Sequence, residues 1–261
     1  MNIKIATWNI NSIRLREDQV CSVLNQHQPD IICLQELKSA TESVPTSRFE
    51  NLGYKYRVIR GQKSYNGVAI ISRIPFMETG SCDYCSKGDA RHVFARLNNG
   101  VEIQNFYVPA GGDIADRESN EKFAHKLDFL QEMKNNFFKK RLSKTIIVGD
   151  FNIVPNESDA SNFSSEDILC SDKERNALKS LFDLGLIDCY TNVGEESPFT
   201  WWDYRGGAFH KDIGYRIDLL LASRETHKSL KRYEVHKDTR HKSWCPEQPK
   251  TSDHAPVMIE F

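Results

Sequence analysis

Residues 145–152 read Thr145-Ile146-Ile147-Val148-Gly149-Asp150-Phe151-Asn152 and hold the strongest structural signal in the chain. The apolar run up to Val148 is typical of a strand that is covered on both faces in an α/β fold. The run stops at Gly149, after which Asp150 and Asn152 lie two residues apart and point to the same side. An Asx turn would use the same residues, but the pattern also predicts a polar site at the end of a buried strand.

Similar short runs bounded by turn residues recur on both sides of this stretch. They predict about nine strands, at residues 3–8, 31–34, 56–59, 68–72, 93–97, 102–108, 145–148, 216–222 and 257–261. Apolar residues three or four apart predict helices at residues 16–26, 121–141 and 172–184, with Phe137 and Phe138 on the apolar stripe of the second. Helices interspersed with many strands indicate an α/β layered fold.

Nothing in the sequence marks an internal domain boundary. It has no internal repeat, low-complexity segment or linker-like tract, so we expect residues 1–261 to form a single domain. The polar stretch 156–171 lacks periodicity, and we expect it to be an excursion on the surface.

Composition is that of an ordinary globular protein. With 39% hydrophobic residues the chain can form a substantial core, and no apolar run approaches the roughly 20 residues of a membrane span. The opening residues lack the layout of a secretory signal, so we expect a cytoplasmic monomer without a membrane partner. The 7 cysteines are odd in number in a chain too large to need disulfides, which predicts reduced, mostly buried thiols.

Net charge does not indicate a nucleic-acid partner. The formal charge is −1, so no overall positive field would attract one. Charged residues of both signs nevertheless make up 27% of the chain, which allows a local basic face around an acidic centre.

Two other strand ends carry candidate ligands for a cation. Thr7-Trp8-Asn9-Ile10-Asn11 places two amides where the first strand ends, although an Asn in a turn is usually structural. Ile31-Ile32-Cys33-Leu34-Gln35-Glu36 is an apolar strand that ends on a carboxylate. Mg²⁺ binds through one or two carboxylates and keeps several waters, so Glu36 suffices as a primary ligand; a solvated glutamate would give the same pattern.

A buried carboxylate and a histidine form the last candidate pair. Asp218 interrupts the apolar run 216–222 and would be costly to bury without a partner. Ser252-Asp253-His254, just before the terminal strand, supplies one, because an imidazole beside an aspartate is held more readily as imidazolium. A lone histidine is more often a satisfied polar residue than a catalyst, and the chain has 8.

The combination of these separated segments is more specific than any of them alone. Asp150 can accept a proton from an attacking water, and Asn152 can orient that water or bind a developing oxyanion. With Glu36 and His254, they predict a metal-dependent phosphoryl centre with in-line attack by water.

In chain order, six motifs resemble the exonuclease III family of abasic-site endonucleases. They are Trp8-Asn9-Ile10-Asn11, Leu34-Gln35-Glu36, Tyr107-Val108-Pro109, Gly149-Asp150-Phe151-Asn152-Ile153, Arg216-Ile217-Asp218 and Ser252-Asp253-His254. The resemblance covers essentially the whole chain. It implies a four-layer α/β sandwich in which helices flank two packed mixed β-sheets, with the site at one end.

The resemblance also implies roles for the matched residues. Glu36 would be the main metal ligand for Mg²⁺, with Mn²⁺ as the alternative, and five further residues would lie at the metal directly or through water: Asn9, Asn11, Asp150, Asn152 and Asp253. Asp150 would activate water, Asn152 and Tyr107 would contact the phosphate, and Asp218 would orient His254 toward the transition state.

The implied substrate is double-stranded DNA with abasic sites or blocked 3′ ends. Such a protein would be of the compact bacterial type and would associate with the nucleoid through DNA. Tyr65 and Asn66 would track the DNA backbone, while the basic run 228–232 would do so less securely, because a solvated helical face explains it equally well. After Pro109 the chain has Ala110-Gly111-Gly112 where several relatives carry an amide, which puts one backbone contact in doubt.

An aromatic segment favours the DNA-repair branch of the superfamily. Residues 199–207, Phe199-Thr200-Trp201-Trp202-Asp203-Tyr204-Arg205-Gly206-Gly207, resemble its abasic-recognition segment. A flipped sugar without a base is small and apolar, so Trp201, Tyr215 and Ile217 would form a wall that admits it. A tryptophan-rich corner of the core would look the same.

Two rival functions remain open. One is a phosphatase or phospholipase of the same superfamily, which residues 199–207 disfavour. The other is a catalytically silent DNA-binding module, which the intact set of acid, base and metal residues disfavours. The sequence does not rank abasic-site incision against 3′→5′ exonuclease, 3′-phosphatase or 3′-phosphodiesterase action, since one centre serves all four.

Overall fold

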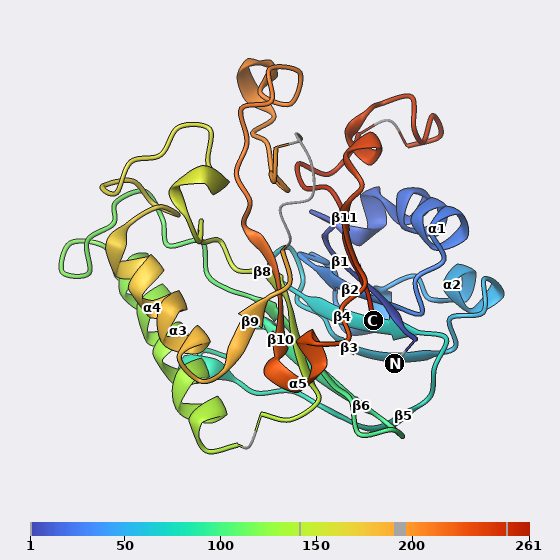
Figure 1. Cartoon of the computed structure of the whole chain (residues 1–261). Helices are drawn as coiled ribbons and strands as arrows, with labels where there is room; N and C mark the ends of the chain where they lie inside the picture. The colour runs from blue at the N-terminus through green and yellow to red at the C-terminus, as the bar shows by residue number, and fades with distance from the viewer. Residues whose placement is uncertain (1, 141, 191–196, 249) are drawn as a thin grey trace.

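The computed structural model describes residues 2–140, 142–190, 197–248 and 250–261 as two six-stranded sheets with helices on their outer faces (Figure 1). The first sheet has the order β11-β12-β1-β2-β4-β3 and the second β5-β6-β7-β8-β10-β9. Both sheets mix parallel and antiparallel pairs. The expected four-layer α/β sandwich is therefore confirmed.

Within the described ranges there are twelve strands. Their bounds are β1 Lys4–Asn9, β2 Ile31–Gln35, β3 Tyr56–Arg60, β4 Val68–Ser72, β5 Phe76–Gly80, β6 His92–Leu97, β7 Glu102–Tyr107, β8 Thr145–Asp150, β9 Leu186–Asp188, β10 Asp218–Ser223, β11 Arg232–Val235 and β12 Val257–Glu260. The sequence patterns did not predict β5, β9 and β11. Each is short or lies at a sheet edge, so its side chains lack the buried apolar run that marks a central strand.

The core between the sheets forms because inward and outward side chains alternate along the central strands. Ile146 and Val148 of β8 face the other sheet, whereas Ile147 faces the helices on the outer side. Ile5 of β1 and Ile31 of β2 meet them from the opposite sheet. Fully burying such a side chain contributes about 1.5–3 kcal/mol, so the apolar strands hold the two sheets together.

The helices cover the two outer faces. The α1 helix (Glu17–Gln26) and α2 helix (Ser47–Asn51) lie on the first sheet, while α3 (Glu121–Phe138) and α4 (Asp172–Phe182) lie on the second. A fifth short helix, α5 (Arg224–His227), follows β10. The α4 helix begins with a capping box, in which the Ser171 hydroxyl and the Glu174 carboxylate each satisfy a backbone N–H of the other residue.

The expected bounds of three elements need correction. The first helix starts at Glu17 rather than Arg16. The second, α3, ends at Phe138, with Arg141 outside the described residues, and the third, α4, ends at Phe182 rather than Leu184. Phe138 is 76% exposed, so its place on the apolar stripe was wrong, because Phe137 beside it already fills the core-facing position. The run 228–232 is not a helical face, since α5 ends before Lys228 and Arg232 begins β11.

The stretch 156–171 is more than a surface excursion. Asp159 is 1% exposed and its carboxylate pairs with the guanidinium of Arg216 at 2.9 Å, which also pairs with Asp188 at 2.8 Å. A charge can be buried only with a partner, so this ion pair ties the stretch to the start of β10.

All seven cysteines lie within the described ranges and are free thiols, as expected, five of them buried. Cys82 and Cys85 form the chain's one C-x-x-C spacing, and both are half-buried. Among the described residues no helix has the length and apolarity needed to cross a bilayer.

Candidate active site

The strand registers bring the polar residues together at one edge of the sandwich. In the second sheet, Asp150 at the end of β8 lies opposite Tyr107 at the end of β7 and Asp218 at the start of β10. In the first sheet, Asn9 at the end of β1 lies opposite Gln35, which precedes Glu36. Because the sheets pack face to face, these two rows meet, and the Asn9 amide donates to the Asp150 carboxylate at 2.9 Å.

The backbone turns sharply directly after these strands. Asn11, Glu36 and Asn152 all have positive φ, at 45°, 53° and 52°. Left-handed backbone is uncommon outside glycine and is often associated with functional sites, because the surrounding fold must hold it in place. The turns place these three candidate ligands directly after the ends of β1, β2 and β8.

Glu36 is held by donors on three sides. Its Oε1 accepts from the Tyr107 hydroxyl at 2.6 Å and from Asn9 Nδ2 at 3.2 Å, while its Oε2 pairs with Lys38 Nζ at 2.7 Å. Burial by itself would raise the pKa of Glu36, but the Lys38 charge and these hydrogen bonds lower it. Glu36 is therefore an ionised carboxylate in a largely enclosed site.

Asp150 lies at the centre of the group and is 1% exposed. Its Oδ1 accepts from the Asn152 backbone N–H at 2.9 Å, and its Oδ2 lies 3.8 Å from Nε2 of His254. Burial raises the pKa of Asp150 to about 7, against the opposing charge of His254. A carboxylate with this pKa is suited to accept a proton near neutral pH.

His254 and Asp218 form the expected pair. The imidazole Nδ1 lies 2.8 Å from Asp218 Oδ2, and both residues are buried. Burial opposes the charge on His254, but the Asp218 carboxylate and its hydrogen bond raise the pKa of the imidazole to about 10. His254 is therefore held as an imidazolium whose Nε2–H faces the centre of the site.

Asp253 and Asn11 complete the polar rim. Asn11 Nδ2 donates to Asp253 Oδ1 at 3.0 Å, and Trp201 Nε1 donates to Asp253 Oδ2 at the same distance. These bonds and the His254 charge lower the pKa of Asp253 despite its burial. Asp253 thus presents a second ionised carboxylate beside Asn11.

The donor set fits a hard divalent cation. Lys38 Nζ lies 2.7 Å from both Glu36 Oε2 and Asn11 Oδ1, so two oxygens from different strands already converge on one positive charge. Carboxylate and amide oxygens are the ligands that Mg²⁺ takes, with water filling the remaining positions. The group Asp150, Asp218 and His254 also has the spacing of a metal site. We favour the Glu36 side, because a charged imidazole bonded to Asp218 has no free electron pair for an ion.

Asn152 is placed firmly by its own loop. Its Nδ2 donates to the Val108 carbonyl at 3.0 Å, and its carbonyl accepts from the buried ammonium of Lys126 at 2.6 Å. Asn152 thus follows the end of β8 by two residues, with its side-chain amide bonded to the Val108 carbonyl.

Tyr65 and Asn66 lie on a loop beside Glu36. The backbone N–H of Lys38 donates to the Asn66 carbonyl at 2.9 Å, and that of Leu37 donates to the Gly67 carbonyl at 3.0 Å. Tyr65 is 69% exposed, so an aromatic ring extends into solvent next to the metal-ligand candidates.

The three expected wall residues lie together but are closely packed. The rings of Trp201 and Tyr215 are 5.6 Å apart, and Ile217 is 2% exposed. Leu169, which has a positive φ of 75°, packs into the same apolar cluster. The cluster adjoins the catalytic group, because Trp201 forms β-bridges with both Tyr215 and His254.

Two residues of the site, Lys38 and Arg91, were not predicted from the sequence, and two others, Thr200 and Tyr204, were expected only as members of the segment 199–207. Thr200 accepts the backbone N–H of Asp218 at 3.1 Å, Tyr204 contacts Asn11, and Arg91 lies over the ring of Tyr107. Only Lys38 could have been predicted from the sequence, because a cation two residues after a candidate metal ligand such as Glu36 can pair with that carboxylate.

Comparison with known proteins agrees with this geometry. Residues 6–254 match the model of the Endonuclease/Exonuclease/phosphatase family. The chain belongs to this family.

Its branch is that of exodeoxyribonuclease III and the AP endonucleases. The chain is 31% identical to exodeoxyribonuclease III of Haemophilus influenzae, over 99% of this chain and 100% of that protein. The structure of an AP endonuclease from Archaeoglobus fulgidus has a TM-score of 0.89 at 30% identity, covering 99% of each chain. The 3′ phosphatase NExo from Neisseria, solved with a product DNA hairpin, has a TM-score of 0.88 at 33% identity and the same coverage. This member of the exonuclease III family is a hydrolytic nuclease.

Proposed function

We propose that this nuclease repairs DNA by hydrolysing the phosphodiester 5′ to abasic sites and by removing blocking groups and nucleotides from 3′ ends of duplex DNA. The observation that carries the proposal is the convergence of Glu36, Asp150 and the His254–Asp218 pair at one edge of the sandwich. The relatives support the substrate, since one is named an AP endonuclease and another was solved with a product DNA hairpin.

The mechanism assigns one task to each group. The Asp150 carboxylate takes a proton from the attacking water, and the Asn152 side chain orients that water. His254 Nε2–H donates to a non-bridging phosphate oxygen and stabilises the charge of the transition state, while Asp218 holds the imidazole in the required orientation. Tyr107 holds Glu36 through its hydroxyl.

A divalent cation would be held by Glu36 with Asn9, Asn11 and Asp253 nearby, directly or through water. We propose Mg²⁺, with Mn²⁺ as the alternative. Bound there, it would supply Lewis-acid stabilisation of the phosphate and leaving oxygen.

The test is incision of a duplex that carries one abasic-site analogue, with Mg²⁺ and with a chelator, against an undamaged duplex. We expect metal-dependent cleavage 5′ to the lesion in the wild type and none in Asp150→Asn. Hydrolysis of phosphoinositides or sphingomyelin without DNA cleavage would assign the protein to another branch of the superfamily and contradict the proposal.

The close packing of Trp201, Tyr215 and Ile217 favours a second candidate function, the processing of 3′ ends without incision at abasic sites. A flipped abasic sugar needs space beside Trp201, yet Leu169 and Ile217 occupy the cluster there. A duplex with a nick that carries a 3′-phosphate separates the two functions. Release of phosphate without abasic incision would support the narrower function, and incision of both substrates would support the full one.

The domain organisation, the oligomeric state and the location in the cell are part of the same proposal. We infer that residues 1–261 act as one catalytic domain and that the protein works as a monomer in the cytoplasm. A sedimentation measurement that gave a stable dimer would contradict the monomer.

A further inference from the structure

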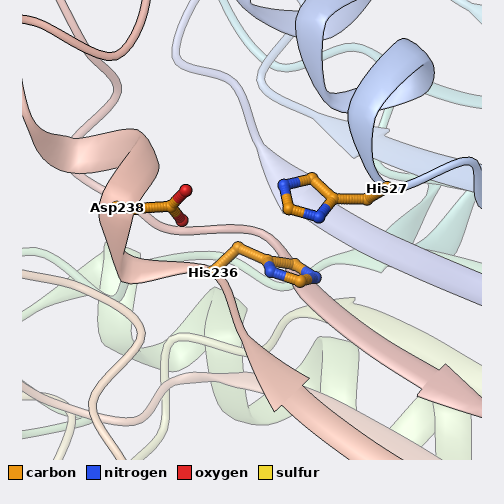
Figure 2. A group of neighbouring side chains, drawn as sticks. All are labelled: His27, His236 and Asp238. Atoms are coloured by element: carbon orange, nitrogen blue, oxygen red, sulfur yellow. The ribbon is translucent and has the colours of Figure 1, made fainter.

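Two histidines from distant parts of the sequence meet where the end of α1 approaches the end of the edge strand β11. His27 follows the last turn of α1, and His236 follows β11 at the edge of the first sheet. Their rings are stacked with centroids 3.8 Å apart and planes at 30°. Figure 2 shows the carboxylate of Asp238 directed toward the two rings.

Each of the two imidazoles has one ring nitrogen that forms no hydrogen bond with the described residues. Within the described part of the chain, Nε2 of His27 and Nε2 of His236 are both buried and form no hydrogen bond. A buried nitrogen without a partner costs free energy, so such atoms call for an explanation. A bound metal ion would provide one, since imidazole nitrogen is a common metal ligand.

We propose that His27, His236 and Asp238 form a second metal site, distinct from the catalytic one, for a borderline divalent ion of the Zn²⁺ class. One ligand atom from each residue lies within 4.8 Å of the other two. Ligand atoms around a tetrahedral zinc ion are about 3.3 Å apart, so modest side-chain rotations close the site. A set of two imidazoles and one carboxylate favours Zn²⁺, Co²⁺ or Ni²⁺ over Mg²⁺.

The backbone around the site is already fixed. The backbone N–H of His27 donates to the Val23 carbonyl at 3.0 Å, and that of His236 donates to the Pro256 carbonyl at 2.9 Å.

Charges of both signs lie near the site, and Lys237, between the two proposed ligands in sequence, donates to the Ser197 carbonyl at 2.7 Å. Asp238 contributes a negative charge, and Arg232, whose charge also acts on His236, is paired with Glu234 at 2.5 Å. An ion held here would join the end of α1 to the edge strand β11. It would stabilise the fold without touching the residues that carry the chemistry.

The experiment is a titration of the full chain with Zn²⁺ in excess Mg²⁺, followed by calorimetry and by the NMR signals of the imidazole rings. We expect one additional ion per chain and shifted signals from His27 and His236. Saturation should raise Tm by about 5 °C when the ion is present at about 100 times its Kd.

Two variants and a matched control decide the outcome. His236→Phe keeps a ring stacked on His27 but removes the ligand nitrogen, so it should weaken Zn²⁺ binding at least about 100-fold, more than loss of an outer partner does. Asp238→Asn should weaken it less, while His210→Ala, an exposed histidine elsewhere, should match the wild type. Nuclease activity should be unchanged in all three variants.

Equal Zn²⁺ titrations in wild type and His236→Phe would overturn the proposal and would assign any binding to thiols or to the catalytic site. If His236→Phe failed to fold, His27→Gln would give the same comparison from the other ligand. Unshifted His27 and His236 signals at saturating Zn²⁺ would overturn it as well.

Discussion

At the scale of single residues, burial sets the chemistry of the site. Asp150 is surrounded by protein and has its pKa raised to about 7, whereas Glu36 has a lowered pKa because Lys38 pairs with it. The two carboxylates are therefore suited to the different tasks proposed for them, Asp150 as a proton acceptor and Glu36 as an ionised ligand.

Replacement of Asp150 by Asn tests the proton acceptor. The amide keeps the size of the side chain but cannot accept the proton from water, so we expect kcat to fall about 10²–10⁴-fold while the Kd for DNA changes only a few-fold. Single-turnover kinetics and a binding titration check this. Asp128→Asn, which removes an exposed carboxylate on α3, is the control and should leave both values unchanged. Wild-type kcat in Asp150→Asn would contradict the assigned mechanism.

The pH profile of kcat should be bell-shaped. Activity rises as Asp150 loses its proton through a pKa of about 7 and falls as His254 loses its proton through a pKa of about 10. Asp218→Asn removes the charge that raises the pKa of His254, so the alkaline limb should move to lower pH. An unchanged alkaline limb in that variant would show that the pair does not govern it.

At the scale of secondary-structure elements, the close approach of β7 and β8 places the site. Gly149 has a φ of 140°, and a Cβ there would lie 1.9 Å from the carbonyl oxygen of Phe106 on β7. Only glycine allows the parallel pairing that sets Tyr107 opposite Asp150.

Gly149→Ala should therefore disrupt both the pairing and the site. We expect a loss of about 3 kcal/mol or more in the free energy of unfolding, together with a fall in kcat, because β8 must move away from β7. Urea unfolding measures the first and kinetics the second. Gly185→Ala, where a Cβ would meet no atom within 4 Å, is the control and should cost only the strain of its positive φ, about 1 kcal/mol. Equal losses in the two variants would argue against the close approach as the cause.

At the scale of the whole molecule, the core and the candidate metal ligands are separate. The apolar core lies between the sheets, whereas Glu36, Asn11 and Asp253 lie at the edge. We therefore expect the fold to persist without the ion that we propose for the chemistry.

Chelation should reveal this separation. Removal of divalent ions should abolish DNA hydrolysis, and added Mg²⁺ should restore it, while the circular dichroism spectrum stays that of the folded protein. Parallel activity and spectroscopic titrations with a chelator check both halves of the prediction. Unfolding on chelation would instead assign the ion a structural role.

The residue patterns were enough to predict an α/β layered fold and the chemical types of the site residues, and the family resemblance implied the four layers. Buried runs such as 146–148 require a strand covered on both faces, and their polar ends mark the edge where function lies. Edge strands such as β11 escaped detection, because a strand paired on one side needs no apolar run. The apolar periodicity also predicted wrongly that Phe138 faces the core, because the neighbouring Phe137 already occupies that position.

Which of these residues come into contact depends on the packing of the two sheets. The register that sets Asp218 opposite Asp150, and the sheet packing that brings Asn9 to the same carboxylate, depend on contacts between distant segments. The local sequence does not predict such contacts. Alternation along a strand shows to which face a side chain points, but it does not give the distance to another strand. For the same reason the sequence did not predict the contact between His27 and His236, which follow the distant elements α1 and β11.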